Sequence, residues 1–502
     1  MAALTSYLRL PGALWALLRA DALAPKEAEP LMPPGWRLTA RALRAFAGPK
    51  ARAGRPGERL ALALEGLGPV AIKFGQFLST RGDIIGAQAA EDLGRLKDRL
   101  APFPTELARA HAEAALGAPL ESLFASFGEP IAAASLAQAH EARLIDGRRV
   151  AVKLLRPQIE RRVARDIAAL ELAAALVQRW VPAARRLEPV GFAATVARAL
   201  ALELDLRLEA AGADELRQAM AQDGYMSAPK VVWEGVGRRV LTLEWAVGRR
   251  LSDPDALDGL DRAALAANLV RGFLAQALKH GVFHADLHEG NLFVSAPDRL
   301  VAVDFGIIGR LSAAERRYLA EILWGFLTRD YDRVASAHFR AGYVAASHDR
   351  GAFAQALRAV GEPVIGRTAA EVSMGRLLTQ LFDVTALFDM RLRPELVLLQ
   401  KTMIVAEGVA RRIWPQTDMW QAAEPVVRRW MARELSPITQ ARALARDARL
   451  ALAHIAAPPN EIRAAETASR AQRGLGAGWA FLLGIATAAT VTLAAAAALG
   501  RL

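Results

Sequence analysis

The sequence predicts an α+β protein in which a small lobe of strands and helices precedes a larger helical lobe. Two observations lead to this class. Strand signals gather between about residues 121 and 250, where β-branched residues alternate with others in Arg149–Lys153 and Arg239–Trp245. From Asp261 onward the pattern is almost entirely helical, apart from short apolar strands at Leu292–Val294 and Leu300–Val303. Strands and helices segregated in this way are typical of α+β folds, and they predict a cleft between two lobes.

The other expected elements follow from the same patterns. Residues 1–120 should be helical, with breaks at the Pro-Gly pairs near residues 35 and 57. We expect a strand from Ile131 onward, helices over Arg161–Val181 and Gly191–Met220, and a strand over Lys230–Trp233. The chain then divides into five segments: a helical N-terminal extension (1–120), a mixed lobe (121–250), a helical lobe (251–435), a basic amphipathic linker (436–473) and a transmembrane helix (474–500).

The composition excludes several kinds of chemistry. The 502 residues include no cysteine, so disulfides, thiolate metal sites and a cysteine nucleophile are excluded. The formal net charge of +12 is compatible with nucleic acid, anionic lipid or phosphate-rich substrates. No dense Lys/Arg run is interleaved with aromatic residues, and 53% of the residues are apolar. The sequence therefore favours lipid contact, and we expect no nucleic-acid partner.

The two ends of the chain differ in their relation to a membrane. The segment from Gly474 to Gly500 contains no charged residue, and about 20 apolar residues suffice to cross a bilayer. We therefore expect one spanning helix, with a buried alanine-rich core helix as the alternative. Arginines are more frequent before this segment than after it, which predicts that the main body is cytoplasmic. Residues 1–24 show no signal peptide and predict an amphipathic surface helix, with membrane-surface contact as the alternative.

The strongest chemical signal is the stretch Phe283–Asn291 followed by Asp304-Phe-Gly. Phosphoryl transfer needs positioned charge and Mg²⁺ rather than covalent chemistry from the protein. Asp286 can orient an attacking group or accept its proton, whereas Asn291 and Asp304 can share the metal through oxygen atoms. An isolated Asp-Phe-Gly is common, but these residues in this order around a strand pair are specific. The alternative is that they are polar turn residues that end strands.

A cationic partner is expected upstream. Lys153 ends the apolar strand Val150–Lys153, where it can reach the α- and β-phosphates of a nucleotide if a glutamate holds it. The glutamate is expected from the helix predicted over Ala193–Met220, in which the candidates are Glu203, Asp205 and Glu209. Ordinary salt bridges on the helix surface are the alternative for these acids. The strand that ends at Glu244 and Trp245 predicts a linker whose backbone could contact adenine.

Two further segments are unusual. Residues 130–140 are rich in alanine where a phosphate-binding loop would be rich in glycine, so the backbone has less freedom to approach phosphate. Upstream, Lys73-Phe-Gly-Gln76 predicts a helix with an internal glycine, which costs about 1 kcal/mol relative to alanine. Such a glycine is usually kept for close helix approach, although a chance glycine in a helix is the more common case.

Together these motifs resemble the UbiB family of atypical protein-kinase-like proteins, over roughly residues 30–435. The resemblance depends on Lys-x-Gly-Gln at Lys73, the alanine-rich loop at Ala132, Val-Ala-Val-Lys153, the Glu-x-Asp of Glu203, and the His-x-Asp and Asp-Phe-Gly motifs. It implies a bilobal protein-kinase-like fold with a helical N-terminal extension. Glu289 departs from the family pattern, in which we expect proline, and it adds negative charge beside the metal loop.

The resemblance also implies roles for the matching residues. Asp286, Lys153 and Glu203 are expected to be catalytic, with ATP and Mg²⁺ as cofactors and with Asn291 and Asp304 as metal ligands. Lys73, Gln76 and Asp205 are expected to be regulatory, because the Lys73 helix should cover the protein-substrate site with Lys73 near Glu203 and Asp205. The expected nucleotide contacts are Ile131, Ala132, Ala133, Ala134, Ser135, Gln138, Lys153, Glu244 and Trp245.

The function implied is an ATP-dependent kinase or ATPase in the bacterial inner membrane that supports ubiquinone biosynthesis through handling of lipid precursors. The expected partners are membrane lipids, isoprenoid or quinone precursors, other ubiquinone-biosynthesis proteins and a second copy in a homodimer. One alternative is a small-molecule phosphotransferase of the aminoglycoside or choline kinase type, which the Lys73 motif and the apolar tail disfavour. The other is a non-catalytic lipid-binding scaffold, which the intact Lys153, Asp286, Asn291 and Asp304 disfavour.

Overall fold

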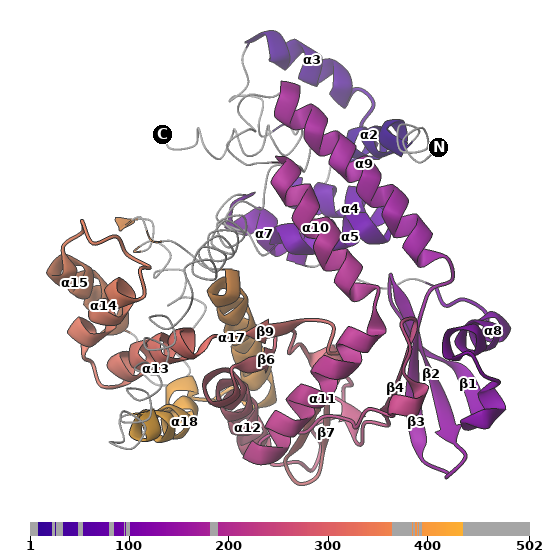
Figure 1. Ribbon diagram of the computed structural model, residues 1–502. Coiled ribbons are helices and arrows are strands. Elements are labelled where there is room, and N and C mark those ends of the chain that lie inside the picture. The colour runs from indigo at the N-terminus through magenta and orange to yellow at the C-terminus, as the bar shows by residue number, and fades with distance from the viewer. Residues whose placement is uncertain are drawn as a thin grey trace, which may run out of the picture. The chain divides into compact units, whose positions relative to one another are not determined.

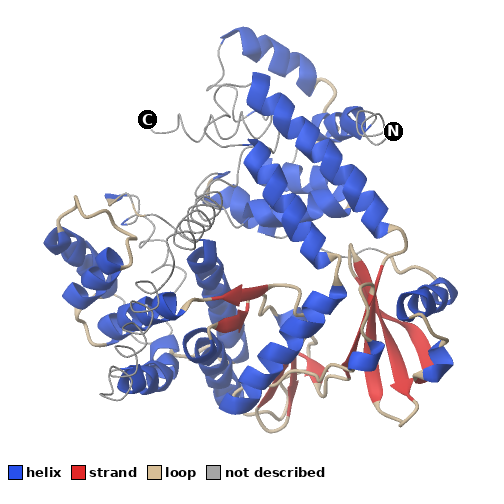
Figure 2. Ribbon diagram, in the orientation of Figure 1, coloured by secondary structure: helices blue, strands red, loops and turns tan. Residues whose placement is uncertain are grey.

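The computed structural model describes residues 9–22, 26, 34–48, 54–79, 85–94, 96, 101–180, 189–363, 384, 387–388, 390 and 394–434 (Figures 1 and 2). The expected linker and transmembrane helix lie outside these residues. Within the described ranges, none of the helices has the length and apolar character needed to cross a bilayer. The described residues form two compact units, one from residues 9–208 and 232–243 and the other from residues 209–231 and 244–434.

The first unit begins with helices, as the sequence predicts. These are α2 (Arg9–Arg19), α3 (Pro34–Arg44), α4 (Pro56–Leu67), α5 (Pro69–Ser79), α7 (Ala87–Gly94) and α8 (Thr105–Leu116). Gly75 of the Lys73 motif lies in α5. A Cβ atom at this position would overlap the side chain of Leu96 and would lie 2.8 Å from Leu64 Cδ1 of α4. Of the two interpretations that the sequence leaves open for this glycine, the structure therefore favours close packing over a chance glycine.

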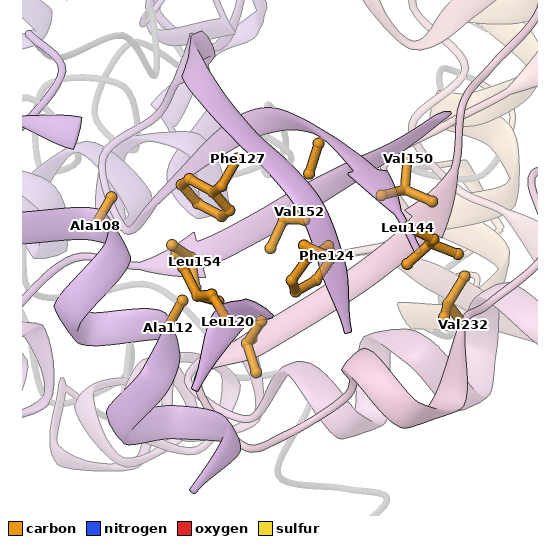
Figure 3. Packing of buried hydrophobic residues seen from close by; sticks show 12 residues of the cluster. Ala108, Ala112, Leu120, Phe124, Phe127, Leu144, Val150, Val152, Leu154 and Val232 are labelled. Atoms are coloured by element: carbon orange, nitrogen blue, oxygen red, sulfur yellow. The ribbon is translucent and has the colours of Figure 1, made fainter. Parts of the chain in front are cut away.

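A four-stranded antiparallel sheet follows, in the order β1 (Phe124–Ala133), β2 (Ala137–Leu144), β3 (Arg149–Leu155) and β4 (Val240–Glu244). Side chains that alternate along β3 point into one core, where Val150, Val152 and Leu154 are fully buried. Figure 3 shows this core, in which Ala108 and Ala112 of α8 face the sheet. The alternating pattern of residues 149–153 thus correctly predicts a half-buried strand.

The helical prediction for residues 191–220 is wrong at one point. The structure has two helices, α10 (Pro189–Glu203) and α11 (Leu206–Asp223), which follow α9 (Ile159–Trp180). The Asp205 carboxylate accepts a hydrogen bond from the Arg207 backbone N–H at 3.2 Å, and the Leu206 N–H donates to Arg238 O at 2.9 Å. An aspartate that bonds the backbone two residues on competes with helix formation, so the chain turns at Asp205.

The strand predicted over Lys230–Trp233 is also corrected. A 3₁₀ turn occupies Trp233–Gly235, and residues 230–232 are extended without forming a regular strand. The extended segment nevertheless pairs with β4. The Val232 N–H donates to Thr242 O at 3.0 Å, and the Glu244 N–H donates to Lys230 O at 2.8 Å.

The second unit combines short hairpins with helices. The strands β5 (Arg249–Arg250), β7 (Leu292–Ser295) and β8 (Arg299–Ala302) form one sheet, and β6 (Val282–His284) pairs with β9 (Ile308–Arg310). The helices are α12 (Arg262–Ala275), α13 (Ala313–Leu327), α14 (Tyr331–Arg340), α15 (Arg350–Gly361), α17 (Pro394–Ile413) and α18 (Met419–Glu434). The strands predicted at residues 292–294 and 300–303 are confirmed within one residue. The pair β6–β9 was missed because β6 is short and buried throughout, so it shows no alternation.

Candidate active site

The loop after β6 carries Asp286 and Asn291 in direct contact. The Asn291 Nδ2 donates hydrogen bonds to Asp286 O at 3.1 Å and to Asp286 Oδ2 at 3.4 Å. Because the amide nitrogen faces Asp286, the amide oxygen is the atom of Asn291 that can ligate a cation. Asn291 is buried, and the loop ends in a single 3₁₀ turn over Glu289–Asn291.

Buried His284 joins this loop to the segment that contains Asp304. Its Nδ1 accepts a hydrogen bond from the Asp286 backbone N–H at 3.1 Å, and its Nε2 lies 3.1 Å from Val303 O. A backbone N–H can only donate and a carbonyl can only accept, so the neutral ring carries its proton on Nε2. Burial lowers the pKa of His284, which favours this neutral form.

Asp304 follows β8 in an unusual backbone conformation. Its φ of 61° lies in the left-handed region, which aspartate tolerates better than most residues with a side chain. The preceding Val303 N–H donates to Asn291 O at 2.9 Å, and Phe305 packs against the His284 ring with centroids 5.4 Å apart. The structure thus brings Asp286, Asn291 and the Asp304 segment together at one edge of the second unit.

The donor atoms of this edge suit magnesium. Two carboxylates and an amide oxygen are hard oxygen ligands, and Mg²⁺ typically takes one or two carboxylates together with phosphate oxygens and water. Among the described residues, no group of three His, Cys, Asp or Glu side chains is placed to hold a metal without such help. The arrangement therefore fits a magnesium ion that is shared with a nucleotide.

The first unit holds the other predicted catalytic residues. Lys153 lies on β3 opposite Ala139 of β2. Glu203, at the end of α10, pairs with Lys73 of α5, with Lys73 Nζ 2.9 Å from Glu203 Oε2 and side-chain exposures of 15% and 18%. Asp205 instead pairs with Arg207 at 2.6 Å. Contact between Lys73 and the Glu-x-Asp pair is therefore seen at Glu203, whereas a Lys153–Glu203 pair stays a prediction.

The alanine-rich segment forms the hairpin between β1 and β2. Ile131, Ala132 and Ala133 end β1, and the Ala134 N–H donates to Ala137 O at 2.8 Å across the turn. Arg156 holds the turn in place, since its Nε donates to Ala134 O at 2.9 Å. The position matches that of a phosphate-binding hairpin, and nucleotide contact by Ala132, Ala133, Ala134 and Ser135 stays a prediction.

Gln138 has a structural role in this hairpin. Its Nε2 donates to Phe103 O at 3.0 Å, while its Oε1 accepts from the Phe103 N–H at 2.8 Å. The side chain is 1% exposed, so its amide is committed to holding residue 103 against the sheet. Glu244 ends β4 and Trp245 follows it, and their contact with adenine stays a prediction.

Several residues that shape the site were not predicted. Gln276 lies in the π-helical turn Gln276–His280, and its Oε1 accepts a hydrogen bond from the His284 N–H at 3.0 Å. Arg412 of α17 forms an ion pair with Glu289. The extra negative charge at Glu289 is therefore matched by a cation more than 120 residues away in sequence, a pairing that no local pattern could reveal.

The fold and two family matches define the class of this protein. The fold is similar to that of the Mycobacterium tuberculosis protein Rv3197, solved in complex with erythromycin, with a TM-score of 0.54 and 21% identity over 78% of this chain and 98% of that one. Residues 95–338 match the ABC1 atypical kinase-like domain, and residues 357–418 match the UbiB helical domain. The chain thus has an atypical kinase-like domain and is an enzyme of that class.

The family follows from sequence identity. The protein called "Probable protein kinase UbiB" from Marinobacter nauticus is 40% identical over 388 residues, which are 76% of this chain and 71% of that protein. Its counterpart from Xanthomonas axonopodis pv. citri is 43% identical over 395 residues, with 76% and 71% coverage. The chain belongs to the UbiB family, as its motifs predict.

Proposed function

We propose that this protein is a membrane-associated, magnesium- and ATP-dependent enzyme that supports ubiquinone biosynthesis. The observation that carries the proposal is the cluster of Asp286, Asn291 and the Asp304 segment, which buried His284 holds together. The relatives named as probable protein kinases support phosphoryl chemistry at this cluster. We propose that the protein uses ATP to drive the handling of lipid precursors. The γ-phosphate of ATP passes to water or to a small acceptor.

The residues take distinct roles in this proposal. Asp286 orients the attacking hydroxyl or water and accepts its proton. Lys153 contacts the α- and β-phosphates, and the β1–β2 hairpin covers them. When bound, Mg²⁺ supplies charge neutralisation to the phosphate oxygens, and Asn291 and Asp304 are the residues that would hold it.

The ion pair between Lys73 and Glu203 supports turnover without protein phosphorylation. Glu203 is the residue expected to hold Lys153, and it also forms an ion pair with Lys73 of α5. Gly75 lets α5 pack closely against α4, so the Lys73 helix is firmly placed. We propose that α5 acts as a lid that limits access for large protein substrates while it leaves nucleotide chemistry possible.

A membrane location is supported by two features. The uncharged segment 474–500 predicts a single C-terminal span in the bacterial inner membrane, with the catalytic body in the cytoplasm. In the described part of the chain, Trp15 of α2 is 51% exposed and its ring lies 6.2 Å from that of Phe46, which is 55% exposed. Arg19 lies 6.0 Å from the centroid of the Trp15 ring. Exposed aromatic residues beside arginine suit the surface of an anionic bilayer.

The test is magnesium-dependent ATP hydrolysis by the full chain, with and without liposomes that contain anionic lipid. We expect hydrolysis that anionic liposomes increase and that Asp286→Asn abolishes. Ala132→Gly should change the ratio of ATP to ADP affinity, because it restores backbone freedom to the hairpin. Absence of both nucleotide binding and hydrolysis on liposomes would refute the enzyme proposal and favour a lipid-binding scaffold. Phosphorylation of amino-alcohols in a substrate screen would instead favour the small-molecule kinase alternative.

A further inference from the structure

Helix α17 contacts the loop of Asp286 and Asn291 at two points. The Thr402 Oγ1 donates a hydrogen bond to Ala285 O at 3.2 Å, directly before Asp286. Ten residues further along the same helix, Arg412 forms an ion pair with Glu289, two residues before Asn291. The two contacts therefore lie close in sequence to the two polar residues at either end of the loop.

The Arg412 contact is the more decisive of the two. The Thr402 hydroxyl is also 2.8 Å from Leu398 O of its own helix, so its single proton is shared between two carbonyls. Arg412 is exposed (46%) and Glu289 is partly buried (28% exposed), and they carry full and opposite charges. The ion pair also neutralises a carboxylate that stands between Asp286 and Asn291 in the sequence.

The regular secondary structure of the loop is limited to one short turn. Its 3₁₀ turn over Glu289–Asn291 has the Asn291 N–H donating to His288 O at 2.9 Å and the Gly290 N–H donating to His288 Nδ1 at 3.0 Å. His288 is itself about half exposed. A single turn of this kind is weak in isolation, so the ion pair from α17 adds to the order that the hydrogen bonds of His284 and Asn291 give the loop.

The two sides of this contact belong to different sequence modules. Thr402 and Arg412 lie in the segment that matches the UbiB helical domain (357–418), whereas Ala285 and Glu289 lie in the atypical kinase-like domain (95–338). Both lie in the second unit of the fold. The helical module thus reaches the catalytic loop through identifiable side chains.

We propose that Arg412 is a positioning residue: through Glu289 it orders the turn that presents Asn291, and the helical module thereby sets the readiness of the loop for magnesium and nucleotide. The catalytic role of this loop rests on the proposed function. The order of the loop is a separate property, and it can be measured without substrate.

The first test is backbone hydrogen exchange of residues 284–292 in the full chain without nucleotide. Glu289→Gln and Arg412→Gln should each accelerate exchange of the Gly290 and Asn291 amides by about two- to five-fold, the range expected for a partly exposed ion pair. The double variant should exchange no faster than either single variant, because both remove the same contact. Arg412→Lys, which keeps the cation, should retain most of the protection.

Arg411 provides a matched control on the same helix. It pairs with Glu407 of α17 at 3.0 Å, so Arg411→Gln removes an arginine and an ion pair of that helix without touching Glu289. We expect loop exchange in Arg411→Gln to equal that of the wild type. Equal acceleration in Arg411→Gln and Arg412→Gln, additive effects in the double variant, or no acceleration in Arg412→Gln would each overturn the proposal.

A second measurement connects loop order to magnesium. The double variant Glu289→Gln/Arg412→Gln has the same net charge as the wild type, so a change in its magnesium requirement reflects order rather than charge. The Mg²⁺ concentration for half-maximal binding of a non-hydrolysable ATP analogue should rise about two- to five-fold. An unchanged requirement would contradict the proposal. If no variant and no wild type bound the analogue while the exchange pattern held, the proposed function would fail and the positioning role would stand.

Discussion

The oxygen-rich loops of the second unit and the lysine-bearing elements of the first unit are held by different forces. Around Asp286 and Asn291 most contacts are hydrogen bonds to backbone groups that centre on fully buried His284, and the Arg412–Glu289 ion pair adds to them at the surface. Glu203 forms an ion pair with Lys73, and both side chains reach solvent. Neutral buried networks are rigid and insensitive to salt, whereas partly exposed ion pairs can exchange partners. The comparison suggests a fixed metal edge and an adjustable lysine–glutamate element.

The largest expected effect comes from His284→Leu. This change leaves the Asp286 N–H and Val303 O without their partner in a buried place, at roughly 1–3 kcal/mol for each group. Magnesium-dependent hydrolysis should fall by about 10- to 100-fold, as for other residues that support metal ligands. Calorimetry and initial rates measure both effects. His348→Leu, outside this loop, is the control, and an equal loss in both variants would show that the network around His284 has no special role.

The second unit should also lose stability in acid. Burial lowers the pKa of His338 to about 4, whereas the unfolded chain takes up this proton near pH 6.5. Between these values the unfolded state binds more protons, so the free energy of unfolding falls as the pH falls, by about 1.4 kcal/mol per pH unit at most. Burial lowers the pKa of His284 as well, and its contribution has the same sign. Denaturant unfolding from pH 7 to pH 4 should show a smaller slope in His338→Leu; an identical slope would contradict this.

Gly75→Ala tests the packing of α5 in the first unit. The added methyl group would overlap Leu96 and crowd Leu64, which should cost about 1–3 kcal/mol of stability. Gly66→Ala in α4 is the matched control, since a Cβ there meets nothing within 4 Å. Thermal unfolding should show a loss only for Gly75→Ala. Similar melting temperatures for the two variants would mean that α5 can shift to accept the methyl group.

The smallest expected effect belongs to the Lys73–Glu203 ion pair. A double-mutant cycle of Lys73→Gln and Glu203→Gln should give a coupling of about 1 kcal/mol or less, because the pair reaches solvent. This coupling should shrink in 1 M salt, whereas the cost of His284→Leu should not change. A coupling that resisted salt would remove the distinction between the two regions.

The parts of the site that could be predicted from the sequence are those whose residues lie close together along the chain. The strand pair around residues 292–303 and the Asp286, Asn291 and Asp304 motif were recognisable because each depends on local spacing. The helix break at Asp205 was missed because the bond from Leu206 to Arg238 depends on a distant turn. The hydrophobic periodicity of a sequence gives no information about such a tertiary contact.

The supporting residues were beyond sequence reasoning for the same reason. Gln276 meets His284 only because the chain forms a π-helical turn, and Arg412 meets Glu289 only because α17 returns to the loop. The sequence marks Glu289 as an added negative charge beside the metal loop, and the structure shows its partner. Motifs therefore reveal the groups that perform chemistry, and the fold reveals the groups that hold them.

The central claim is that the edge formed by Asp286, Asn291 and Asp304 binds ATP together with magnesium. The most direct measurement is equilibrium binding of a non-hydrolysable ATP analogue to the wild type and to Asp304→Asn, each with and without Mg²⁺. We predict that Mg²⁺ strengthens binding to the wild type and that Asp304→Asn loses most of this gain, with its affinity in Mg²⁺ lowered by at least the roughly 10- to 100-fold typical of residues that only support metal ligands. Equal magnesium-dependent affinity in the two proteins would show that Asp304 is not a metal ligand and would contradict the account.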